Sequence, residues 1–333
     1  MSLPGRLRLK TYSHLAQSRT VPSEYTITTT DLLFTATKGH SVVTPVTEWQ
    51  KKYVDGSLLM TKDVPFQDPE SYTYTKYVTV RNKKEIFLEG IYSAIEQSTY
   101  RDSLSDDWRL KVQRCLGAFV YICHGMQMAS AYLGQMGSSG QLIAMLAMQT
   151  ADELRRTENL VHQLLILNPR TDEALTEGTN TWMTDPAFQK VRSTLENLLV
   201  TYDWGEAYVA FNLVFKPLMD EMFLKEFAVE AAANADPLLE KILLSLAEDS
   251  DWHRLCAKTY TANVLKQDPK NSDAINKWIA MWKPLIKEMI AELSPALYES
   301  QTKSQTLESF LNSWLESLQT TPKEQTWSTA QTL

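Results

Sequence analysis

An uncharged run extends from Cys115 to Ala151 and is interrupted only by the small-residue stretch Gly137-Ser-Ser-Gly140. A long apolar run with one short break predicts two buried helices joined by a tight connection. The run leads directly into Asp152 and Glu153. Carboxylates that continue a buried helix are the first candidates for metal ligands in this chain.

A carboxylate-bridged di-iron bundle has one glutamate on each of two helices and a Glu-x-x-His pair on each of two others. This chain has that spacing but not those residue types. Arg156 follows Glu153 where a histidine is required, and Ser250 stands where a glutamate would precede His253. The facing helix offers a cation, Lys216, at the expected depth of a glutamate. We predict a degenerate site that holds no metal, no other cofactor and no catalytic residue, formed by Glu153, Arg156, Lys216, Ser250 and His253.

The sequence leaves two interpretations of this cluster open. In one, Arg156 and Lys216 replace the positive charge of iron and pair with inward-pointing acids such as Glu153. In the other, Glu153 and Arg156 form an ordinary surface pair at i,i+3. Taken alone, His253 is expected to be a hydrogen-bonded core histidine rather than a metal ligand. Asp203 and Glu206, three residues apart at a helix start, are expected to cap that helix rather than to catalyse.

Composition excludes several other classes of function. The net charge of -7 and the isoelectric point near 5.4, without a basic cluster, argue against a nucleic-acid partner. Residues 115–136 are apolar, but their histidine, glutamine and serine side chains would be costly in lipid, so no membrane span is expected. The three cysteines have no metal-ligand spacing, and the N-terminal residues lack an apolar signal core, which favours the cytoplasm. Cys115, Cys123 and Cys256 are expected to be small buried apolar residues.

The pattern along the chain predicts an all-α, ferritin-like bundle of long helices with an extended N-terminal arm. Residues 1–83 form the expected arm, rich in Thr, Ser, Pro and Tyr, and residues 72–80 alternate like an extended strand. Residues 301–333 are expected to hold a C-terminal helix and a polar tail. The bundle, residues 84–300, has expected helices at 84–99, 104–135, 138–167, 185–200, 203–232, 236–267 and 271–300.

Several helix starts carry a capping side chain, at Ser105, Asp185, Asp236 and Asn271, and proline follows two of them. Pro217 falls inside the expected helix 203–232. Because proline removes one backbone hydrogen bond and clashes with the preceding turn, we expect a kink or a widened turn there.

A resemblance to a known family rests on short segments in a fixed order. They are Thr11-Tyr-Ser-His-Leu-Ala16, Pro22-Ser-Glu-Tyr25, Gln127-Met-Ala-Ser-Ala-Tyr132, Gln149-Thr-Ala-Asp152, Asp203-Trp-Gly-Glu-Ala207 and Lys216-Pro217. Together they resemble the β (small) subunit of the hydroxylase of bacterial multicomponent di-iron monooxygenases, in the toluene, alkene and isoprene branch.

The resemblance implies a ribonucleotide-reductase-like helical fold in an (αβγ)2 assembly. It places the di-iron centre in the α subunit and describes β as a relative of α that has lost its ligands. The implied partners are α, γ, an effector protein, a ferredoxin-type carrier and a flavin reductase that uses NADH. The implied reaction, in α, inserts one oxygen atom from O2 into an aromatic or alkene hydrocarbon. The arm at residues 1–80 would wrap α.

Two alternatives from other classes remain. The first is a stand-alone ferritin-like oxidase with an unusual ligand set of Glu153, Glu158, His162 and His253, in which Glu158 and His162 share a helix face at i,i+4. The second is a helical adaptor unrelated to oxygenases, whose aromatic arm would dock peptides.

Overall fold

The computed structural model describes residues 23–29, 45–96, 98–168 and 171–319. Every regular element within these ranges is a helix, which confirms the all-α prediction. The expected polar tail, residues 320–333, and most of the first 44 residues of the expected arm lie outside the described residues. No helix of the described part is long and apolar enough to cross a membrane.

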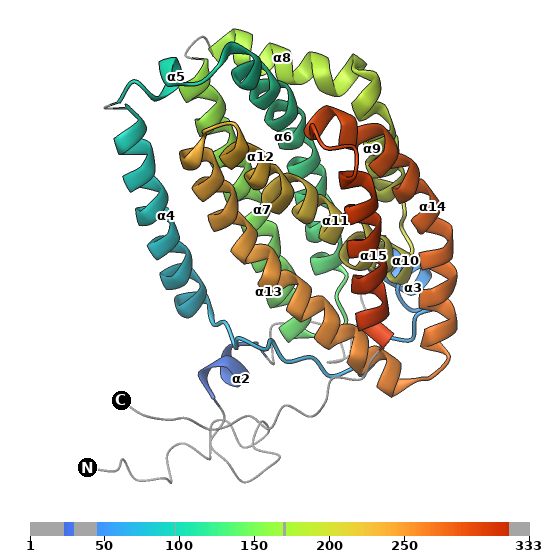
Figure 1. Cartoon of the computed structure of the whole chain (residues 1–333). Coiled ribbons are helices and arrows are strands. Elements are labelled where there is room, and N and C mark those ends of the chain that lie inside the picture. Colours follow the sequence, from blue (N-terminus) through green and yellow to red (C-terminus); the bar gives the residue numbers. More distant parts are fainter. Residues whose placement is uncertain (1–22, 30–44, 97, 169–170, 320–333) are drawn as a thin grey trace, which may run out of the picture.

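The long helices run side by side as a bundle (Figure 1). Helices α4, α7 and α13 lie next to one another on one side, and α8 crosses the upper end. The helices that form the bundle are α4 (Tyr74–Glu96), α6 (Asp106–Gln135), α7 (Gly140–Leu167), α8 (Thr171–Thr184), α9 (Pro186–Leu199), α13 (Pro237–Gln267), α14 (Asn271–Leu297) and α15 (Lys303–Gln319). Short helices α2 (Glu24–Thr29), α3 (Pro45–Tyr53) and α5 (Tyr100–Ser103) lie at its ends.

One helical segment is buried along most of its length. It comprises α10 (Trp204–Tyr208), the π-helix η3 (Val209–Phe215), α11 (Lys216–Asp220), the π-helix η4 (Glu221–Glu226) and α12 (Phe227–Ala233). All residues of η3 and α11 are buried. A helix that is enclosed on all sides has to be apolar all round, and this explains the apolar sequence on both sides of Lys216.

The π-helices on either side of α11 confirm the widened turn that Pro217 predicts. Proline has no N–H, so it cannot donate to the preceding turn, where the bonds are of the i→i−5 kind, as from the Lys216 amide to the Phe211 carbonyl. The indole Nε1 of Trp314 on α15 donates to the Leu213 carbonyl in this turn at 2.9 Å. A side chain from another helix therefore satisfies a backbone carbonyl close to Pro217.

Three of the predicted capping side chains do cap their helices. Ser105 accepts from the Trp108 amide, and Asp185 and Asp236 accept from amides in the first turns of α9 and α13. The expected cap at Asn271 is wrong: the helix begins there, but its side chain donates to the carbonyls of Met60 and Val264 instead.

The strand expected at residues 72–80 and the helix start at residue 84 are both wrong, because α4 begins at Tyr74. β-branched and aromatic residues favour strands only where a neighbouring strand can pair with them. No strand lies within the described residues. A helix instead places one face of α4 against the bundle, and that face carries Tyr77, Arg81, Leu88, Tyr92 and Ile95, all buried.

The described part of the arm packs against the chain's own bundle. Val54, Leu59, Val64 and Phe66 are buried in the common core. Asp68 is 2% exposed and accepts a hydrogen bond from the Trp252 indole of α13 at 2.9 Å. Residues 54–73 are therefore an integral part of the folded domain.

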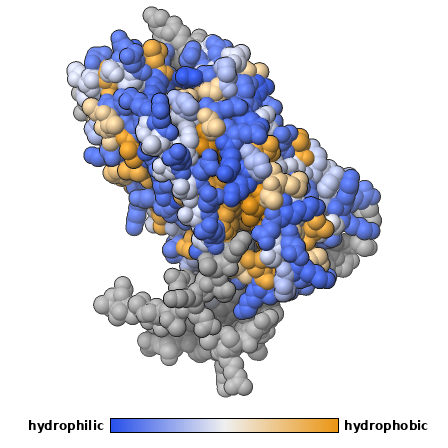
Figure 2. All heavy atoms as spheres, turned by 45° about the vertical axis from the view of Figure 1, so that its right-hand side comes forward, coloured by the Kyte–Doolittle hydropathy of each residue, from blue (hydrophilic) through white to orange (hydrophobic). Residues whose placement is uncertain are grey.

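The surface shown in Figure 2 is mostly polar, with apolar residues gathered in smaller areas between polar ones. Large apolar side chains that are exposed occur on several helices, among them Ile86 on α4, Leu110 on α6 and Met281 on α14. Scattered exposure of this kind is normal for a folded chain.

Candidate functional site: a buried ring of charges

Glu153 and Arg156 lie on the inner face of α7. The Glu153 side chain is 0% exposed and that of Arg156 is 1% exposed, and Arg156 Nη1 donates to Glu153 Oε2 at 2.8 Å. The surface-pair interpretation is therefore wrong. A buried carboxylate beside a buried guanidinium avoids the cost of leaving either charge alone in the core.

Lys216 meets the same carboxylate from the facing helix. Its ammonium group is 2.6 Å from Glu153 Oε1 and 2.9 Å from Oδ2 of Asp220, one turn further along α11. Arg156 Nη1 also donates to Asp220 Oδ1, at 2.9 Å. These four buried side chains, Glu153, Arg156, Asp220 and Lys216, alternate in charge around a closed circuit, which we call the charge ring.

Each carboxylate of the charge ring contacts both cations. Glu153 accepts from Lys216 through one oxygen and from Arg156 through the other. Asp220 accepts from Arg156 through Oδ1 and from Lys216 through both oxygens, Oδ2 at 2.9 Å and Oδ1 at 3.2 Å. Burial acts to raise the pKa of Asp220, but the charges of Lys216 and Arg156 outweigh it and hold that pKa well below its usual value. The ring, with two carboxylates and two cations, is formally neutral.

Ser250 joins the ring and His253 does not. The Ser250 hydroxyl, on α13, accepts from Arg156 Nη2 at 3.0 Å. His253, one turn later, has its Nε2 3.0 Å from Oδ2 of Asp152, the residue before Glu153. It is a buried, hydrogen-bonded histidine, as was expected of His253 taken alone, and four of the five predicted residues come together.

A second cluster surrounds Asp152. Its carboxylate accepts from Arg81 and from the Tyr77 hydroxyl, at 2.6 and 2.8 Å, both from α4. Burial would raise the pKa of Asp152, yet the hydrogen bonds from Arg81 and His253 bring it well below its usual value. For His253 the balance is reversed: burial, and next the charge of Lys216, lower its pKa.

Sequence reasoning missed Asp220, Arg81 and the role of Asp152. Asp220 had a usable signal, because an acid four residues after Lys216 in a helix lies on the same face. Arg81 had none, since it fell in residues 1–83, which were expected to form an extended arm. The partner of His253 also depends on how α13 packs against α7, and the spacing of residues within one helix holds no information on that packing.

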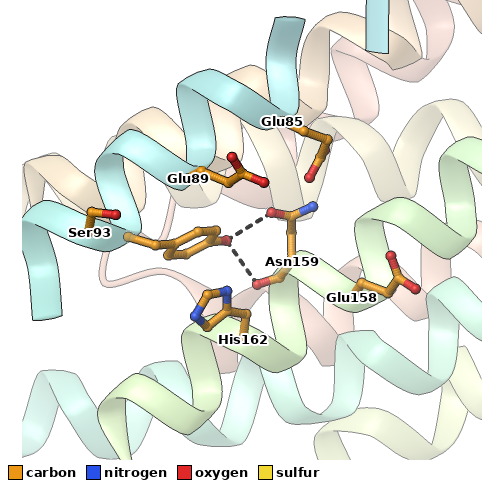
Figure 3. Close-up of a pocket in the computed structure, with 7 residues that line it drawn as sticks. Glu85, Glu89, Ser93, Glu158, Asn159 and His162 are labelled. Atoms are coloured by element: carbon orange, nitrogen blue, oxygen red, sulfur yellow. Dashed lines mark hydrogen bonds between the residues drawn. The ribbon is translucent and has the colours of Figure 1, made fainter. Parts of the chain in front are cut away.

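The alternative oxidase ligand set is not brought together. Glu158 and His162 are exposed and line a surface groove between α4 and α7, with Glu85, Glu89, Ser93 and Asn159 (Figure 3). The His162 ring stacks on that of Tyr92, with the centroids 4.0 Å apart. Glu153 and His253 are buried instead, so one metal centre cannot include all four residues.

A di-iron centre of the kind that the resemblance places in α does not fit these residues. All four oxygens of Glu153 and Asp220 already accept hydrogen bonds from buried cations. Two divalent ions would have to displace those cations and would meet two carboxylates, half the number that their combined charge requires in a buried place. Within the described ranges, no group of three or more His, Cys, Asp and Glu side chains could hold a metal ion.

The remaining candidates have structural roles. Asp203 accepts from the Glu206 amide at 2.9 Å, which confirms the capping prediction. Cys115, Cys123 and Cys256 are free and buried, as expected. Burial raises the pKa of the Cys115 thiol to about 12, and so keeps it protonated.

Comparisons with known proteins agree with the resemblance. Residues 49–268 match the Methane/Phenol/Alkene Hydroxylase family. The chain is 30% identical over 294 residues to the toluene-4-monooxygenase hydroxylase component subunit beta of Ectopseudomonas mendocina, covering 85% of this chain and 89% of that protein.

Solved structures have the same fold. A structure of toluene 4-monooxygenase with toluene bound in the resting active site matches with a TM-score of 0.79 at 27% identity, over 86% of this chain and 97% of that one. A crystal structure of phenol hydroxylase from Pseudomonas sp. OX1, at 18% identity, matches with a TM-score of 0.82 over 90% of this chain and 91% of that one. The ferritin-like expectation is confirmed, the unrelated-adaptor alternative is not supported, and the chain belongs to the Methane/Phenol/Alkene Hydroxylase family.

Proposed function

We propose that this chain is the non-catalytic β subunit of a multicomponent monooxygenase hydroxylase. The complex inserts one oxygen atom from O2 into an aromatic or alkene hydrocarbon, and the chemistry takes place in the larger α subunit. The similarity to a toluene-4-monooxygenase β subunit over most of both chains supports the assignment to this class. The substrate pocket would belong to α.

The observation that carries the non-catalytic role is the charge ring. A di-iron centre needs carboxylates with oxygens free to bind metal, together with histidine nitrogens that face the ions. In this chain Glu153 and Asp220 are fully occupied by Arg156 and Lys216. His253 directs Nε2 at Asp152 instead. Catalysis therefore requires another chain.

The remaining partners follow from the family assignment. We place this chain in an (αβγ)2 assembly in the cytoplasm, with the di-iron centre in α. An effector protein, a ferredoxin-type carrier and an NADH-dependent flavin reductase complete the system. In this arrangement the chain supports α and helps to form the dimer through a large permanent interface.

The test is co-expression with the proposed α subunit, followed by metal analysis of the separated subunits. We expect iron in the larger chain, none in this one, and NADH-dependent hydrocarbon oxidation only when both are present with the electron-transfer components. This chain expressed without α is the matched control and should be metal-free and inactive. Iron bound stoichiometrically to this chain, with oxidation in the absence of α, would refute the proposal.

A further inference from the structure

The connectivity of the charge ring matches that of a carboxylate-bridged dinuclear centre. Glu153 directs one oxygen to Arg156 and the other to Lys216, and Asp220 accepts from Arg156 through Oδ1 and from Lys216 through Oδ2, at 2.6 to 2.9 Å, with a longer bond of 3.2 Å from Lys216 to Oδ1. Each carboxylate therefore bridges the same two positive groups. An isolated buried ion pair would not need this double bridging.

We propose that Arg156 and Lys216 occupy the places of two metal ions, and that these cations and the missing carboxylates are what prevent metal binding. The fold itself has kept the capacity to bind metal. This inference deepens the proposed function and rests on it, because it explains how a subunit of this family remains folded without iron.

Charge balance supports the substitution. Two carboxylates neutralise two monovalent cations, whereas two divalent ions carry twice that charge and need four carboxylates. An uncompensated charge in a core is costly because the interior solvates it poorly. With Arg156 and Glu153 at 1% and 0% exposure, solvent does not screen any imbalance. The two carboxylates therefore balance the two monovalent cations, Arg156 and Lys216, and do not balance two divalent metal ions.

The positions that would restore a metal site already lie together. Arg156 is the third residue after Glu153, and Ser250 is the third before His253. The Arg156 guanidinium bonds the Ser250 hydroxyl, and the Lys216 ammonium bonds Glu153. Replacing Arg156 by histidine, and Ser250 and Lys216 by glutamate, gives four carboxylates and two histidines, the same numbers as in a di-iron bundle, with the acids at 216 and 220 both on α11 and none on α6.

His253 supplies an independent observation. Its Nδ1 is buried and has no hydrogen-bond partner within the described part of the chain, while Nε2 is bonded to Asp152. An unpartnered ring nitrogen in a core costs free energy. This nitrogen is also free to bind a metal ion, and it lies beside the ring because His253 follows Ser250 by one helical turn.

The experiment is a titration of the full chain with cobalt(II) chloride, followed by visible absorption and by urea unfolding with and without the metal. The wild-type chain should take up no cobalt. The triple variant Arg156→His, Lys216→Glu, Ser250→Glu should bind up to two ions per chain, develop visible absorption bands, and unfold at higher urea concentration with cobalt. A helical, folded triple variant that binds no cobalt would overturn the inference, as would equal binding by the wild type.

Arg81→Met is the matched control. It removes another buried cation, on Asp152, but leaves the ring intact. It should lower stability and bind no cobalt. Cobalt uptake by this variant would show that any unpaired buried carboxylate recruits metal, which would contradict the specific role of Arg156 and Lys216.

A double-mutant cycle covers the case in which the triple variant does not fold. Glu153→Gln and Lys216→Met each leave the ring with one unbalanced charge, whereas the double variant removes one charge of each sign. The double variant should have a folding constant at least about tenfold higher than the two single losses predict when combined. Additive losses would contradict charge coupling in the ring.

Failure of this inference is distinguishable from failure of the proposed function. A native chain that oxidises hydrocarbon without a larger partner overturns the proposed function. A folded triple variant that binds no cobalt contradicts only the inference that side-chain cations replace metal ions.

Discussion

Arg81 on α4 binds Asp152 on α7 through two parallel hydrogen bonds, Nε to Oδ1 and Nη2 to Oδ2, each 2.6 Å long. Both side chains are largely buried, at 8% and 0% exposure. This bidentate pair fixes the first long helix of the chain to the helix that carries the charge ring.

Replacing Arg81 by methionine should destabilise the chain by about 3–5 kcal/mol, because the Asp152 carboxylate is left buried with less compensation. Arg81→Lys keeps the charge but loses the forked geometry, so it should fall between the wild type and Arg81→Met. Urea unfolding measures both. Stability equal to the wild type in Arg81→Met would show that α4 is held by apolar packing alone.

His253 should make stability depend on pH near neutrality. Burial lowers its pKa in the folded chain, so the unfolded chain binds the proton more tightly. The stabilisation is complete above the unfolded value of about 6.5 and is lost as the pH falls from there towards the folded pKa. Urea midpoints between pH 7.5 and pH 5 should fall for the wild type and fall less for His253→Gln. The low pKa values of Asp152 and Asp220 place their own losses at more acid pH. Equal slopes for both proteins would exclude His253 as the source.

Helices α6 and α8 cross at Gly117 and Gly178. A Cβ on Gly117 would lie 2.7 Å from the Gly178 Cα, which is backbone and cannot move aside. Gly117→Ala should therefore cost about 1–3 kcal/mol through overpacking.

Gly90 on α4 is the matched control, because its added Cβ meets nothing within 4 Å. Gly90→Ala should stabilise the chain by about 0.5–1 kcal/mol through helix propensity. Thermal unfolding of both variants tests the prediction, and two losses of similar size would contradict it.

The cysteine thiols should be unreactive in the folded chain. Cys115, Cys123 and Cys256 are buried, and burial raises the pKa of each thiol. The thiolate, which is the reactive form, is therefore scarce and inaccessible. Titration with Ellman's reagent should give no rapid reaction in buffer and three equivalents in denaturant. A rapidly reacting thiol in buffer would show that one cysteine is accessible in solution.

Much of the helical framework follows from local signals. Ser105, Asp185 and Asp236 mark starts that the structure keeps, because a cap needs only its own first turn. The π-helices beside Pro217 also have a local cause, because a proline inside a helix has no N–H to donate to the preceding turn. The errors at residues 72–80 and at Asn271 have the opposite cause. Both segments have local preferences that contacts with distant residues override, such as Tyr77 with Asp152 and Asn271 with Met60.

By itself the sequence determined that this chain is a bundle of long helices, since helical spacing fixes which side chains share a face. It also predicted, without deciding it, that Glu153, Arg156, Lys216 and Ser250 belong to one altered metal-site pattern. Only the tertiary structure decided that these groups are buried, that Asp220 closes the ring, and that His253 pairs with Asp152. Those contacts join α4, α7, α11 and α13. Charges on separate helices meet only where packing brings them together, and no spacing along one helix contains that information.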